Sequence, residues 1–141
     1  MIEETDEISN SVLASKPFDF DLTDFNAITQ AEFSLHLSQK PSYLSNSMNA
    51  FSINLYENQK IETEESILRF EVTKSGLCLG MIQWLKIKIY QDIEYENKPG
   101  EVFSHWPTPL YRFDKSIYLV KGDIIEIRAF LGEDDIYFYK L

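Results

Sequence analysis

The chain has 141 residues, which fits one domain of ordinary size and leaves no room for a catalytic domain together with a second module. Its 13 Lys and Arg residues against 23 Asp and Glu residues give a formal charge of −10, which argues against a nucleic-acid-binding surface. Hydrophobic residues make up 44% and aromatic residues 14% of the chain, so we expect a folded core rather than a disordered polypeptide.

Residues 1–16 are polar and acidic, and the sequence predicts a flexible lead-in or linker there. One β-domain is expected to follow over residues 17–141, because from Pro17 onward the apolar residues recur at every second position. This period is typical of strands with one face toward water. The first strands are expected within residues 18–22, 33–37 and 51–55.

Three hairpins are expected in the second half of the chain. Their turns are predicted at residues 74–76, 121–123 and 132–135. The first hairpin contains a long second strand over residues 77–89, in which Gly80 predicts a bulge or a sharp bend. Apolar residues on both faces of this strand predict that its middle is covered on both sides and that Trp84 is largely buried.

Helical periodicity is nearly absent beyond Pro17, where the best candidate, residues 24–31, is barely two turns long. The predicted fold class is therefore all-β. Short strands separated by turn residues indicate a single antiparallel β-barrel or sandwich of about 8–10 strands.

Few residues of the chain could carry chemistry. Cys78 is the single cysteine, which excludes an internal disulfide and a cysteine-based zinc site, and its apolar strand predicts an inert buried thiol. Asp19, Asp21 and Asp24 lack the glycine and glutamate that would complete a calcium loop. The five glycines form no phosphate-binding loop. The sequence therefore predicts no catalytic residue, no metal site and no cofactor site.

A cytoplasmic location without a membrane segment is the expected setting. No apolar run approaches the roughly 20 residues that span a bilayer. The acidic start, which includes Glu3 and Glu4, is the reverse of the basic first region of a signal peptide. The lone cysteine agrees with a reducing compartment.

The segment from Asn97 to Pro107 differs from plain scaffold. A Pro-Gly turn is followed by Ser104, His105 and Trp106, which places a titratable group and a large aromatic ring in a loop. One interpretation is that Trp106 plugs one end of the barrel while His105 satisfies a backbone carbonyl. The other is that this loop lies at one end of the barrel, partly accessible, and faces a substrate or a partner.

Several segments stand in the order that one known family shows. They are the strand pair from Phe70 to Ile89, the loop Ser104-His105-Trp106, the strands 110–113 and 117–120, the turn Gly122-Asp123 and the early strand 18–22. Together they resemble the C-terminal β-barrel domain of the protein arginine methyltransferases, in which the loop reads Thr-His-Trp. The polar glutamine that follows this loop in the family is replaced by Pro107-Thr108-Pro109, and residues 38–66 have no counterpart.

The resemblance implies a non-catalytic domain, because the S-adenosylmethionine fold and the paired glutamates that hold the substrate are absent from this chain. This chain alone would not be an enzyme, whereas a methyltransferase core joined to it in cis or in trans would be. In the family the barrel forms one wall of the substrate groove, so the resemblance implies that His105 orients groups or relays protons and that Trp106 shapes the groove. A cationic peptide would suit the acidic charge.

Two other functions stay open at the level of the sequence. The chain could be an autonomous β-sandwich module that binds a peptide or a glycan on exposed Tyr and Trp side chains. It could also be an interaction domain that serves only oligomerisation. None of the three hypotheses involves nucleic acid or a membrane.

Overall fold

A computed structural model describes residues 1–6, 8–9, 21, 32–35, 41–56, 61–100, 106 and 108–141. Within these residues the chain forms nine strands, which confirms the all-β class. The strands are β1 (Ile2–Glu3), β2 (Glu32–Leu35), β3 (Glu64–Glu71), β4 (Gly76–Ile82), β5 (Lys86–Tyr90), β6 (Ile93–Glu96), β7 (Thr108–Leu119), β8 (Ile124–Leu131) and β9 (Ile136–Lys140).

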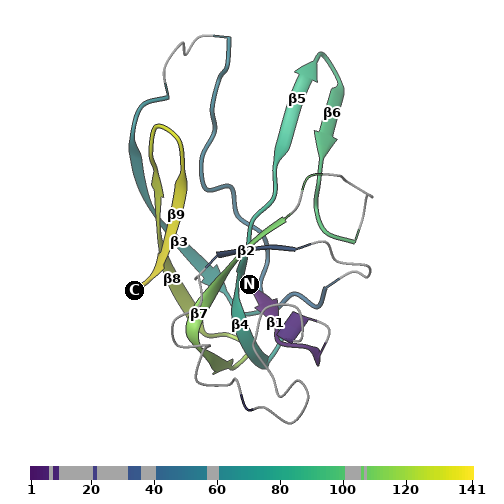
Figure 1. Cartoon of the computed structure of the whole chain (residues 1–141), viewed down its shortest axis with the longest axis vertical. Coiled ribbons are helices and arrows are strands. Elements are labelled where there is room, and N and C mark those ends of the chain that lie inside the picture. Colours follow the sequence, from purple (N-terminus) through teal and green to yellow (C-terminus); the bar gives the residue numbers. More distant parts are fainter. Residues whose placement is uncertain are drawn as a thin grey trace.

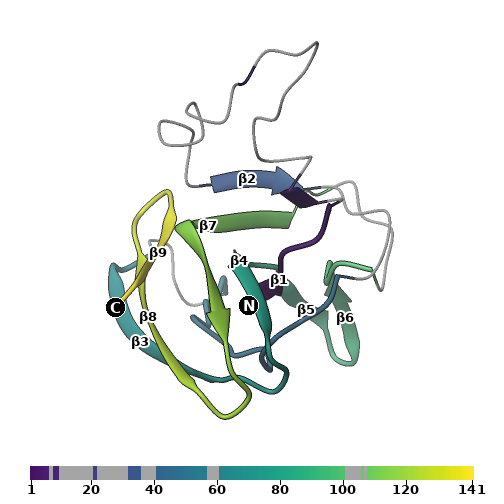
Figure 2. The same cartoon turned by 90° about the horizontal axis from the view of Figure 1, so that it is seen from below.

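The strands are arranged in three antiparallel sheets. The first has the order β1-β4-β7-β2, the second the order β3-β8-β9, and the third is the hairpin β5-β6. The described strands form no closed barrel, since the three sheets are hydrogen-bonded separately. The sheet β3-β8-β9 and the β5-β6 hairpin lie on opposite sides of the molecule in both views (Figures 1 and 2). The Tyr56 hydroxyl donates to the Ile89 carbonyl of β5 at 3.2 Å.

Two of the three predicted hairpins are wrong as strand pairs. Strand β3 pairs with β8, and β4 pairs with β7, so the turns after β3 and β7 connect one sheet to the other. The two turns lie together: the Val72 N–H donates to the Asp123 carbonyl at 2.9 Å, and the Gly122 N–H donates to the Val72 carbonyl at 2.8 Å. Gly122 has a φ of 97°, a conformation that favours glycine. These turns therefore form a corner between the sheets.

The third predicted hairpin is confirmed, since β8 pairs with β9. The Gly132 N–H donates to the Asp135 carbonyl at 2.7 Å and closes its turn. The strand predicted at 51–55 is wrong, because these residues form no strand. Of the other early predictions, β2 confirms the first part of 33–37. Residues 36–37 and, apart from Asp21, residues 18–22 lie outside the described residues.

The bulge predicted at Gly80 is confirmed. The register between β4 and β7 shifts between Cys78 and Gly80, so that Gly80 stands opposite Arg112. The long strand predicted over 77–89 is interrupted, because β4 ends at Ile82 and β5 begins at Lys86 in a different sheet.

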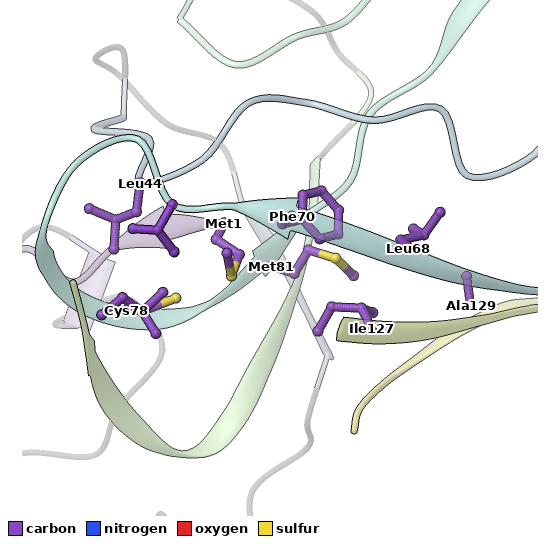
Figure 3. Close-up of a cluster of buried hydrophobic side chains, with 10 residues drawn as sticks. Met1, Leu44, Leu68, Phe70, Cys78, Met81, Ile127 and Ala129 are labelled. Atoms are coloured by element: carbon purple, nitrogen blue, oxygen red, sulfur yellow. The ribbon is translucent and has the colours of Figure 1, made fainter. Parts of the chain in front are cut away.

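The core lies on both faces of β4, as the apolar pattern predicts. One face supplies Cys78 and Met81 to a cluster shared with the sheet β3-β8-β9; its buried members are Met1, Leu44, Leu68, Phe70, Val72, Cys78, Met81, Leu119, Ile127 and Ala129. Figure 3 shows Phe70, Met81 and Ile127 gathered at its centre. The other face supplies Leu79 and Ile82 to a second cluster with Ile2, Ile8 and Leu110.

The first residues belong to the packed structure rather than to a flexible lead-in. Met1 and Ile2 are buried, and β1 pairs with β4. The physical reason is that these two apolar side chains occupy the space on either face of β4. Glu3 follows them and forms an ion pair with Lys74 at 2.7 Å. Residues 10–16 and the boundary predicted at Pro17 lie outside the described residues.

Candidate functional site

The predicted site residues are only partly described. Trp106 is described and 52% exposed, so its side chain does not plug the core. Its ring meets Tyr95 of β6 edge to face, with 5.6 Å between ring centroids and an interplanar angle of 81°. Ser104 and His105 lie outside the described residues. Through this contact, Trp106 of the predicted loop packs against the β5-β6 hairpin.

The β5-β6 hairpin is amphipathic. Ile87 pairs with Tyr95, and Tyr90 pairs with Ile93 across the two strands. Cross-strand partners share a face, and on β6 the residues Ile93 and Tyr95 lie on the same face because they are two positions apart. The register shift between Lys88 and Tyr90 brings Tyr90 to the face of Ile87, so these four side chains lie on one side of the hairpin. Tyr90 is 63% and Ile93 59% exposed, while Ile87 and Tyr95 are half-buried. We call these four residues the hairpin face.

The opposite side of the hairpin is polar. Lys86 pairs with Glu96, and Lys88 pairs with Glu94. Lys86 forms an ion pair with Glu94 at 2.8 Å. The hydrogen bond from Lys86 holds the pKa of the Glu94 carboxyl below its ordinary value, and the same bond raises the pKa of Lys86. Both groups are exposed, so this pair adds little to stability, and its effect is to keep this side of the hairpin polar.

Asn97 anchors the base of the hairpin. Its side-chain oxygen accepts the Leu85 N–H at 2.7 Å, and its own N–H donates to the Leu85 carbonyl at 3.2 Å. Asn97 is buried, and nearby the Trp84 indole N–H donates to the Glu96 carboxylate at 2.8 Å. These bonds close the base of the hairpin, and Trp84 packs against the second cluster, to which β4 contributes Leu79 and Ile82. Sequence reasoning included Asn97 in the unusual segment but missed this anchoring role, for which the sequence carries no signal.

A cation–aromatic cluster follows the anchor. The Lys98 ammonium lies 5.8 Å from the Trp84 ring centroid and 5.9 Å from that of Tyr43, within cation–π range. The Tyr43 hydroxyl donates to the Pro99 carbonyl at 3.3 Å. Trp84 is half-buried rather than largely buried, because its ring lies at the edge of the second cluster, beside Lys98. The chain is thus held in place from Asn97 to Pro99, at the start of the segment that the sequence singles out.

The chemistry of Cys78 and of possible metal ligands can be compared with the described residues. Cys78 is fully buried, as predicted, and burial raises the pKa of its thiol, which disfavours the nucleophilic thiolate. Within the described ranges no three His, Cys, Asp or Glu side chains gather in a way that could hold a metal ion. The same part of the chain contains no helix of the length and apolarity needed to cross a membrane.

No protein-family model matches the chain, and no curated protein matches its sequence. The exposed part of the hairpin face, Tyr90 and Ile93, together with Trp106, is the feature of this region that points most directly to a function.

Proposed function

We propose that this chain is a non-catalytic β-domain that docks onto an S-adenosylmethionine-dependent methyltransferase core, in cis or in trans, and forms one wall of its substrate groove. The observation that carries the proposal is the uncovered hairpin face next to the exposed ring of Trp106. The resemblance of Ser104-His105-Trp106 to the Thr-His-Trp loop of the arginine methyltransferases supplies the class of the partner.

The exposed apolar side chains of the hairpin face favour binding to a partner. A two-stranded hairpin is at best marginally stable in water on its own, and among the described strands β5 and β6 pair only with each other. Yet Tyr90 and Ile93 of this face are more than half exposed. Aromatic side chains at the centre of an apolar patch are typical of protein interfaces. Covering this face would bury Tyr90, Ile93 and the exposed part of Trp106 together.

In this proposal the partner core supplies the chemistry, and this chain supplies part of the substrate-binding surface. The partner core would bind the cofactor and carry the catalytic groups. In the described part of this chain Cys78 is buried, and no three His, Cys, Asp or Glu side chains gather to hold a metal ion. Ser104, His105 and Trp106 would face the core at the groove, and the charge of −10 would attract a cationic substrate peptide. The cytoplasm, where such cores and their cofactor meet, is the proposed setting.

Affinity capture with a matched pair of variants tests the proposal. The immobilised wild-type chain and the double variant Tyr90→Ser, Ile93→Ser are exposed to a lysate of the source cells. Captured proteins are then photocrosslinked to labelled S-adenosylmethionine and identified. Tyr118→Ser is the control, since Tyr118 is 68% exposed on β7, outside the hairpin.

The wild-type chain and the control are expected to retain a protein that crosslinks to the cofactor, and the double variant is expected to lose it. Adding the wild-type chain to that protein should then increase methyl transfer to an arginine-containing peptide. Capture of no cofactor-binding protein, or equal capture by the double variant, contradicts the proposal.

A further inference from the structure

A second exposed aromatic surface lies on the other side of the molecule from the hairpin (Figures 1 and 2). It is the outer face of the sheet β3-β8-β9, where a shallow depression of about 540 Å³ opens to solvent. Its lining residues are Glu65, Arg128, Phe130, Tyr137, Tyr139 and Leu141. We call this feature the aromatic depression.

The rings of the aromatic depression are held in place by the sheet. Phe130 pairs with Tyr137 across β8 and β9, and their ring centroids lie 6.5 Å apart. The Tyr137 hydroxyl donates to the Asp135 carboxylate at 3.0 Å, and this bond raises the pKa of Tyr137. Tyr139 is 57% exposed and pairs with Arg128. The depression therefore presents two tyrosine side chains, one of which is bonded to a carboxylate.

The end of the sheet next to the aromatic depression is rich in carboxylates. Arg128 is the cation in its lining, and its guanidinium lies 3.3 Å from the Glu65 carboxylate, which balances its charge. The start of β3 and the β8-β9 turn lie at the same end of the sheet, because Leu131 pairs with both Glu64 and Ile136. That end carries the exposed carboxylates of Glu62, Glu133, Asp134 and Asp135, whereas Glu64, opposite the buried Leu131, lies on the other face of the sheet.

We propose that the aromatic depression binds a peptide segment rich in arginine or lysine, with a cationic side chain over the rings of Tyr137 and Tyr139. A cation over an aromatic face is stabilised by the ring quadrupole, and the surrounding carboxylates attract the same charge. A second copy of this chain is the less favourable occupant, since each copy has a charge of −10. This inference does not depend on the methyltransferase proposal.

Fluorescence anisotropy with the full chain tests the inference. The probe is a labelled peptide of alternating arginine and threonine, and the charge control is its counterpart with glutamate in place of arginine. We expect the wild-type chain to bind the arginine peptide, with an affinity that falls as salt rises, and not the glutamate peptide. Tyr139→Ala should weaken binding about fivefold, as the loss of one cation–π contact does. Tyr118→Ala, which removes another exposed tyrosine, should leave the affinity unchanged.

Glu65→Gln provides a second variant that does not alter the rings. It removes one carboxylate and leaves Arg128 unbalanced, so binding should weaken about fivefold. The Tyr90→Ser, Ile93→Ser variant should bind the arginine peptide as the wild-type chain does, which separates this surface from the hairpin face.

Three results would overturn the inference. The first is unchanged affinity in both Tyr139→Ala and Glu65→Gln, and the second is a loss of binding in the hairpin variant equal to the loss in Tyr139→Ala. The third comes from sedimentation: self-association of the wild-type chain that Tyr139→Ala abolishes would assign the surface to a second copy.

Discussion

Gly80 and Tyr111 lie in direct backbone contact across β4 and β7, with no space for a side chain between them. A Cβ atom on Gly80 would overlap the Tyr111 carbonyl oxygen and would lie 2.9 Å from the Cα of Arg112. Both obstacles are backbone atoms, which cannot move aside as the end of a flexible side chain does. Gly80 therefore sets the separation of the two strands at the bulge, close to the point where the chain leaves β4 for the hairpin.

Gly80→Ala should lower the free energy of unfolding by about 3 kcal/mol, the upper part of the range for overpacked sites. Gly132→Ala is the comparison, because its Cβ would lie 3.3 Å from the Asp135 carbonyl oxygen, which is a tight contact but not an overlap. This variant should cost less than about 1 kcal/mol. Urea unfolding of both variants measures the difference, and equal losses would show that the close contact has no energetic consequence.

The two tryptophans should respond differently to truncation. Trp106→Ala should cost about 1 kcal/mol or less, since Trp106 is 52% exposed and touches Tyr95 at its edge. Trp84→Ala should cost about 3 kcal/mol, because it removes packing on the second cluster and leaves the Glu96 carboxylate without its indole donor. Thermal or urea melts compare them directly. If Trp106→Ala lowered the free energy of unfolding more than Trp84→Ala does, Trp106 would have a structural role and not be part of an interaction surface.

The period-two pattern of the sequence identifies strands but not their neighbours. Alternation reports which residues share a face, so it predicts β8, β9 and the doubly covered β4. It does not report which strand lies alongside, and for this reason the turns at 74–76 and 121–123 predict hairpins where the structure has a corner between sheets. Residues 51–55 show the same limit: the alternation is present, but no described strand edge pairs with them.

The candidate surface is harder to predict from the sequence than the core. The β5-β6 hairpin turns at Gln91, which has a φ of 48° although it is neither glycine nor asparagine, so Asp92 beside it is the one turn-favouring residue of this turn. The loop residue Trp106 can be singled out because a large aromatic side chain next to prolines is unusual. Its neighbour Tyr95 can be found only from the structure, since the contact depends on how the hairpin is placed.

Stability should depend on Glu3 in the acid range. The hydrogen bonds from Lys74 and Ser42 hold the pKa of Glu3 below its ordinary value of 4.5. The folded state therefore binds fewer protons at this group than the unfolded state, so its contribution is fully present above 4.5 and is lost as the pH falls through the folded pKa. Glu3→Gln should be less stable than the wild-type chain by under about 1 kcal/mol at neutral pH. Urea melts should show this gap closing at strongly acidic pH, and a gap independent of pH would contradict the assignment.

The Cys78 thiol should be unreactive in the folded protein. It is fully buried beside Met1 and Leu44 in the first cluster, and burial raises its pKa. A disulfide-exchange reagent should modify the native chain only at the rate of global opening and should react at once in denaturant. Rapid labelling of the native chain would show that the β4 region is open.

Hydrogen–deuterium exchange tests the central claim most directly. The chain is measured alone and in complex with the cofactor-binding protein that it captures. Our account predicts added protection in β5 and β6 and around Trp106, and no change in β9, which lies on the other side of the molecule. Protection confined to β9, or none in the hairpin when the complex has formed, would contradict the docking of a methyltransferase core on the hairpin face.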